Sequence, residues 1–151
     1  MAKVKYLAEG KNYMKKGKFG DASIEFRNAL RLDPRFVDAY YELAQADLAQ
    51  QNWNAAYASL EKAIGLDPTR LDARLDRGRL YLAARQFSNA EDEANFILQQ
   101  QSDDVGAYQL LGAALMGEQK PDKALAAFAK VTQLRPNDPN AYVNMALVEI
   151  S

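Results

Sequence analysis

Apolar residues recur along this chain at the spacing of short amphipathic helices. A first apolar stripe follows the 3.6-residue helical period over residues 6–14, a break with two glycines covers residues 15–21, and a second stripe covers residues 22–30. Similar breaks recur at residues 50–53, 84–87 and 117–122. No segment alternates between apolar and polar residues at the strand period over a useful length. The pattern therefore predicts an all-α chain of short helices.

The helical pattern is interrupted at a constant interval. Pro34, Pro68 and Pro136 stand in one register of 34 residues, with Ser102 in the remaining position. Proline lacks an N–H group and disfavours helix for the residue before it, so each of these positions predicts a turn. The register divides the chain into units at about 3–36, 37–70, 71–104 and 105–138, with a partial fifth unit at 139–151. We expect one array, cut from a longer protein.

Small and large residues occupy fixed positions within each unit. The small residues of one position, which allow two helices to approach closely, are Gly10, Ala44, Gly78, Gly112 and Ala146; those of another are Ala22, Ala56, Ala90 and Ala124. Trp53 shares its position with Phe19 and Phe87, so we expect it to pack. Because two short helices cannot bury their apolar stripes alone, the units must stack on one another.

The turns between units carry acidic residues. Asp33, Asp67 and Asp103 lie there, and a short acidic side chain at such a place can cap the helix that follows it. We therefore expect these aspartates to act as helix caps. Pro121 is suited to the first turn of its helix.

The order of these residues resembles the tetratricopeptide repeat family. The matching positions in the first unit are Tyr6, Gly10, Tyr13, Ala22, Phe26, Ala29 and Pro34, and those of the fourth are Tyr108, Leu111, Gly112, Ala124, Phe128 and Pro136. The third unit departs from the pattern with Arg74, Arg77 and Ser102, and Asp47 replaces a tyrosine of the second unit. The resemblance implies a right-handed solenoid of antiparallel helix pairs.

The resemblance also implies a binding surface. In this family the concave face, lined by first helices, binds a peptide or a helix of a partner protein. Carried over by register, the residues of this predicted groove are Lys11, Lys15, Asp38, Tyr41, Glu42, Gln45, Asp72, Asp76, Arg79, Gln109 and Asn144. The family therefore implies a non-enzymatic scaffold whose partner is a protein or a peptide.

Charge is distributed unevenly over the units. Residues 3–36 carry nine positive and four negative charges, whereas residues 37–70 carry two and five and residues 71–104 four and seven. One interpretation is a groove with an acidic centre that favours a ligand with basic and apolar groups. The other is that these side chains are solvated, with Lys11 pairing with Glu42 and Arg79 with Asp76. Both interpretations are open at the level of sequence.

Composition removes several classes of function. The chain has no cysteine and no histidine, which excludes thiolate chemistry and takes away the commonest general base and metal ligand. A net charge of −1 gives no global field for nucleic acid, and no apolar run approaches the ~18 residues of a membrane span. The first residues do not read as a signal peptide. We expect no catalytic residue, cofactor or metal, and the compartment stays undetermined.

The last segment is apolar on more than one side. Residues 141–150 include Tyr142, Val143, Met145, Leu147 and Ile150, whereas a terminal repeat ordinarily needs a polar outer face. The array could continue into another helix, this helix could act as a cap, or this end could stack on a second copy and give a homo-oligomer. The sequence thus predicts an interaction scaffold, with a self-associating structural element as the alternative.

Overall fold

The computed structural model describes residues 1–151 and is all-α, as the sequence predicts. The nine helices are α1 (Ala2–Lys15), α2 (Phe19–Leu32), α3 (Val37–Ala49), α4 (Trp53–Leu66), α5 (Leu71–Ala83), α6 (Phe87–Gln100), α7 (Val105–Gly117), α8 (Pro121–Leu134) and α9 (Pro139–Glu149). They correspond to four helix pairs and one further first helix. The predicted recurrence of the helix pair every 34 residues is therefore confirmed.

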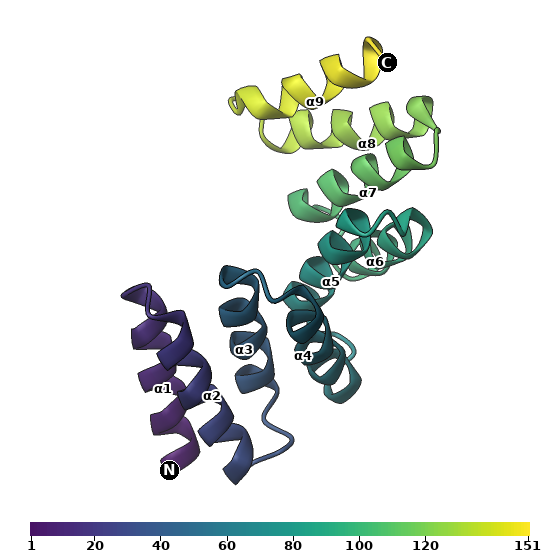
Figure 1. The fold of residues 1–151 in the computed structure, drawn as a ribbon. Coiled ribbons are helices and arrows are strands. Elements are labelled where there is room, and N and C mark those ends of the chain that lie inside the picture. Colours follow the sequence, from purple (N-terminus) through teal and green to yellow (C-terminus); the bar gives the residue numbers. More distant parts are fainter. The chain divides into compact units, whose positions relative to one another are not determined.

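The chain forms two compact units, residues Met1–Ala73 and Arg74–Ser151. In the first unit α1 packs on α2 and α3 on α4, and α2 also packs on α3 (Figure 1). In the second unit α7 packs on α6 and α8, and α9 packs on α8 (Figure 1). Each unit thus builds its own core from neighbouring helices. None of the nine helices combines the length and the apolar character that a membrane-crossing helix needs.

The turn inside each helix pair has the same geometry in all four repeats. Its residue with positive φ is Gly17 (72°), Gln51 (60°), Arg85 (60°) or Gln119 (62°), and these positions are spaced by the repeat length. The next N–H group donates a hydrogen bond back to a carbonyl five residues earlier, as from Lys18 to Tyr13 at 2.9 Å. This hydrogen bond is typical of the left-handed helix end, which satisfies the last carbonyls of the helix.

The position of small residues explains how the two helices of a pair approach each other. A Cβ atom placed on Gly10 would lie 2.4 Å from Cε1 of Phe26, and one placed on Gly112 would lie 2.5 Å from Cε1 of Phe128. Both aromatic rings come from the second helix of the same pair, and Phe26 is fully buried. The glycines are therefore required by close packing and not by backbone conformation.

The turns between repeats are held differently from the way the sequence predicts. The Asp33 carboxylate accepts a hydrogen bond from the N–H of Arg35 at 3.0 Å, and Asp67 accepts one from Thr69 at 3.1 Å. These bonds lie within the turn, and α3 begins without a side-chain cap. The prediction that Asp33 caps the following helix is wrong, because a carboxylate at the end of one helix reaches the nearest free N–H of the turn first.

Other aspartates do cap helices. Asp104, and not Asp103, is the N-cap of α7, and its carboxylate accepts a hydrogen bond from the N–H of Ala107 at 2.9 Å. Asp138 caps α9 by accepting from the N–H of Asn140 at 3.0 Å. Both residues directly precede the first residue of their helix, which is the place from which a short side chain reaches the free N–H groups.

The third repeat replaces part of its apolar core with an ion triad. Glu93 of α6 is 5% exposed, and its carboxylate accepts hydrogen bonds from Arg74 at 2.9 Å and from Arg77 at 3.0 and 3.1 Å. The guanidinium of Arg74 also stacks on the ring of Phe96 at 3.7 Å. Arg74 stands where the other repeats have tyrosine, and Arg77 stands where the second and fourth repeats have leucine. Their departure from the family pattern is therefore compensated inside the same unit.

Candidate partner-binding site

The predicted binding residues of the first unit lie on its first helices. Lys11 and Lys15 belong to α1, whereas Asp38, Tyr41, Glu42 and Gln45 belong to α3, and Asp72 is the second residue of α5. Lys11, Lys15, Asp38 and Asp72 are exposed and the other three are half-buried. Lys15, the last residue of α1, forms no ion pair. The other charged residues form, together with Arg70, two neighbouring groups of charges.

The larger group is centred on Arg70, which the sequence analysis did not assign to the site. Its guanidinium pairs with Asp38 through Nη1 and with Asp72 through Nε, the latter at 2.8 Å. It also lies over the ring of Tyr41, 4.9 Å from the centroid. Burial lowers the pKa of Arg70, but the two carboxylates outweigh burial and hold that pKa above its ordinary value. Arg70 therefore neutralises part of the acidic surface that the sequence predicts.

The second group is an ion pair between α1 and α3. Lys11 Nζ lies 3.9 Å from Glu42 Oε1, as one of the two sequence interpretations predicts. Burial raises the pKa of Glu42, and the cations Lys11 and Arg70 oppose that rise. The half-buried Glu42 is thus held by a long and partly exposed ion pair, which contributes little to stability.

The four predicted residues of the second unit do not form a comparable group. Asp76 and Arg79 of α5 pair at 3.5 Å on one helix face, and Arg79 is largely exposed. Gln109 of α7 and Asn144 of α9 are half-buried and lie on different helices. No group of three or more carboxylates in the structure is arranged to hold a metal ion. Among the predicted site residues, only those of the first unit therefore form a group of several charges.

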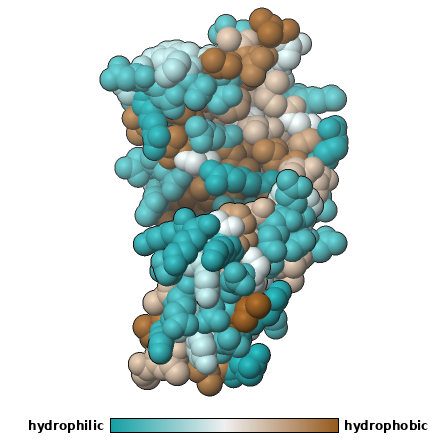
Figure 2. Space-filling model, turned by 60° about the vertical axis from the view of Figure 1, so that its left-hand side comes forward, coloured by the Kyte–Doolittle hydropathy of each residue, from teal (hydrophilic) through white to brown (hydrophobic).

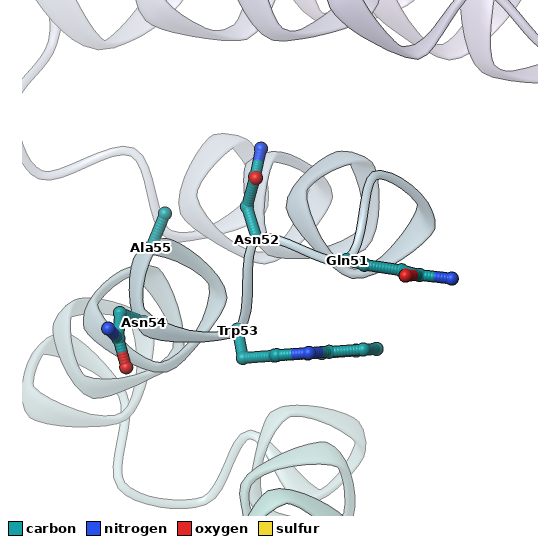
Figure 3. A pocket seen from close by; sticks show the side chains of 5 residues that line it. All are labelled: Gln51, Asn52, Trp53, Asn54 and Ala55. Carbon is teal, nitrogen blue, oxygen red and sulfur yellow. The ribbon is translucent and has the colours of Figure 1, made fainter.

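An open pocket of about 420 Å³ lies at the turn between α3 and α4, in the first unit (Figure 3). It is lined by Gln51, Asn52, Trp53, Asn54 and Ala55. Gln51 and Trp53 extend to the same side of the turn, whereas the Asn52 side chain points away from the indole (Figure 3). Trp53 is 53% exposed, so the expectation that it packs like Phe87 holds only for part of its surface.

Apolar side chains are exposed on the last helix. Figure 2 shows hydrophobic atoms gathered at the top of the molecule, the end at which α9 lies in Figure 1. The exposed apolar residues of this segment are Tyr142, Val143, Leu147 and Ile150. Ala146 is exposed too, whereas the residues in the same position of the earlier repeats are all buried. The face of α9 that would meet a second helix is therefore open.

Comparison with known proteins identifies the family from the sequence, and solved structures share the fold. Three sequence models described as tetratricopeptide repeat match residues 7–70, 47–115 and 105–138. The human protein "DnaJ homolog subfamily C member 3" is 36% identical over 94 residues, which cover 62% of this chain and 19% of that protein. The chain therefore spans about a fifth of the length of this curated relative.

Solved structures share the fold over nearly the whole chain. MamA from Desulfovibrio magneticus RS-1 has a TM-score of 0.93 at 19% identity, with 99% of this chain and 84% of that chain covered. YrrB, described as a tetratricopeptide repeat protein with an unusual peptide-binding site, has a TM-score of 0.84 at 22% identity, covering 96% and 75%. Since the sequence models span residues 7–138 and the helix pairs follow the same register, the chain belongs to the tetratricopeptide repeat family.

Proposed function

We propose that this chain is a protein-interaction scaffold whose first helices bind an extended peptide or a helix of a partner with basic and apolar groups. Members of the tetratricopeptide repeat family act as scaffolds for protein partners, and YrrB, which shares the fold, has a peptide-binding site according to its description. The ligand preference rests on one observation: the three carboxylates Asp38, Glu42 and Asp72 share a surface with two cations, Lys11 and Arg70.

Carboxylates on a binding surface attract a basic ligand and disfavour acidic ones. Tyr41 adds an aromatic face to this surface. In the second unit, the half-buried Asp76 adds a further carboxylate, which pairs with the exposed Arg79 at 3.5 Å. Interactions of this kind set the choice of partner more than the affinity, for which apolar contacts are needed as well.

The test is selection from a displayed library of random peptides. The wild-type chain should enrich peptides that combine Lys or Arg with apolar residues, and the double variant Asp38→Lys with Asp76→Lys should lose this enrichment at unchanged helicity. The matched control, Asp92→Lys with Asp103→Lys, makes the same change of charge at exposed residues outside the predicted groove. If the first double variant still enriches the same peptides, the acidic surface does not select the ligand.

We propose self-association through α9 as the second candidate function. It is supported by the exposure of Leu147 and Ile150, which reach 54% and 81%, and by the uncovered Ala146. Exposed apolar patches of this kind often mark protein interfaces. Light scattering over a wide concentration range tests it: the wild-type chain should form dimers or larger species, and Leu147→Glu with Ile150→Glu should remain monomeric. A wild-type chain that stays monomeric at high concentration refutes this candidate.

A further inference from the structure

Arg70 occupies a place in the first unit that has the chemistry of a guanidinium-binding site. The residue belongs to the segment between α4 and α5, and its side chain reaches back to α3. There it meets two carboxylates, those of Asp38 and Asp72, and the ring face of Tyr41. Three groups from two helices thus surround one planar cation.

This arrangement suits arginine better than lysine. A guanidinium is planar, carries five N–H donors in a fixed fork, and stacks on an aromatic ring while its edges face carboxylates. A lysine ammonium is a compact point charge that cannot use the ring and both carboxylates in the same way. In the structure, Nη1 and Nε of Arg70 each have one carboxylate partner, and Cζ lies over the Tyr41 ring, 4.9 Å from its centroid.

Because of its position in the chain, Arg70 can leave its partners without any change in the helices. Arg70 lies outside both neighbouring helices, and its backbone N–H donates to the carbonyl of Asp67 at 3.1 Å. Its side chain is 24% exposed, and those of Asp38 and Asp72 are 54% and 46% exposed. The side chain can therefore swing into solvent without loss of a helical hydrogen bond, and the groups that it leaves stay accessible.

We propose that Arg70 is a specificity-determining residue of this surface, because it holds in the free protein the place that an arginine side chain of the partner takes on binding. This inference rests on the proposed function, and it narrows the basic ligand to one that presents arginine. Arg70 competes with the incoming arginine for the same carboxylates and the same ring. A partner must therefore bring further apolar contacts to displace it, which excludes ligands that are merely basic.

Removal of Arg70 should open the site. Arg70 is held in the site by two partly exposed ion pairs and one cation–π contact, and each of these favours the occupied site by about a few-fold. Because Arg70→Gln removes this competition, it should strengthen binding of an arginine side chain by about tenfold. A lysine side chain should gain clearly less, because it does not replace the stacking on Tyr41. The neutral isostere citrulline should gain nothing.

The experiment is a titration of the full chain with N-acetyl-arginine methylamide, followed by the amide resonances of Asp38, Tyr41 and Asp72 in two-dimensional NMR spectra. The lysine and citrulline counterparts are titrated in parallel. Arg35→Gln is the matched control, because it removes the same charge from an exposed turn residue of the same unit that forms no ion pair. It should bind the arginine compound as weakly as the wild-type chain does.

The inference is overturned if Arg70→Gln binds the arginine compound no better than the wild-type chain, or binds citrulline equally well. If that variant lacks the circular dichroism of the wild type, Arg70→Lys replaces it, and an unchanged arginine affinity in this second variant also overturns the inference. Failure of the proposed function has a different signature. In that case no peptide is enriched by either chain, although the arginine compound still binds Arg70→Gln.

Discussion

The buried ion triad of the third repeat allows the loss of stability on removal of Glu93 to be predicted. Glu93 is almost fully buried, and the side chains of Arg74 and Arg77 are only 14% and 15% exposed. Glu93→Ala removes the carboxylate that the two guanidinium groups share in the core of the second unit. Removal of one partner from a buried pair costs about 3–5 kcal/mol. Since both arginines retain some access to water, we expect the lower end, about 3 kcal/mol.

The fourth repeat of the same chain supplies the compensating variant. At the corresponding positions it has Tyr108, Leu111 and Ala127, of which Leu111 packs against an apolar core and Ala127 is buried. Arg74→Tyr, Arg77→Leu and Glu93→Ala together should therefore restore stability, because replacing a buried ion group by apolar residues of similar volume is neutral or stabilising by about 1–4 kcal/mol. The three changes should not be additive, since the residues are in direct contact.

Thermal and urea unfolding followed by circular dichroism at 222 nm measure both effects. For a chain of this length about 3 kcal/mol corresponds to a decrease of about 6–12 °C in Tm. Asp92→Ala is the control, because Asp92 is an exposed residue of the same helix, and its change should stay within about 0.5 kcal/mol. If the triple variant is as unstable as Glu93→Ala alone, loss of the counter-ion is not the cause.

Three further predictions concern packing and pH. Gly112→Ala should destabilise the chain by about 1–3 kcal/mol in urea unfolding, because the added Cβ overlaps the ring of Phe128 and outweighs the gain in helix propensity. Gly65→Ala, in the same assay, should stabilise it by up to about 1 kcal/mol, because nothing lies within 4 Å of the added atom. Burial raises the pKa of Asp47 above its ordinary 3.8, against a smaller opposing effect of Arg27, so the contribution of this group to stability is complete below pH 3.8 and is lost as the pH rises through the folded-state pKa. Asp47→Asn should therefore stabilise the chain at pH 7 and not at pH 3, and an equal gain at both pH values would contradict this reasoning.

The sequence predicts the helices well because their determinants are local. The helical period, the small residues and the interval between prolines predict four helix pairs and one further helix, and α8 begins at Pro121 as expected. The left-handed conformation of Gln51, Arg85 and Gln119 is harder to predict from the sequence, because only the first of the four turns has glycine at this position. There the repeat itself, and not the residue type, is the useful signal.

The candidate site was predicted less well because its chemistry depends on contacts between repeats. Asp38 and Arg70 are 32 residues apart, and nothing in their local sequence shows that the arginine reaches back across the turn. One signal was available: Arg70 stands two residues before Asp72, in the position that Phe36 occupies in the preceding repeat. A cation at this position, next to the acidic first helices, indicates an internal counter-ion for them.

The charged residues that replace the usual apolar or aromatic residues of the repeat therefore differ in their consequences for stability and for binding. Arg74, Arg77 and Glu93 compensate one another in a buried place, so they need no partner and leave no surface for one. Asp47 is buried, and burial raises its pKa against the smaller effect of Arg27, so it reduces stability at neutral pH. Arg70 is paired with carboxylates, as Arg74 and Arg77 are, but its partners Asp38 and Asp72 remain exposed to water. A charged residue that is paired within the chain can be exchanged for a ligand group only when its partners are accessible, and Arg70 meets this condition.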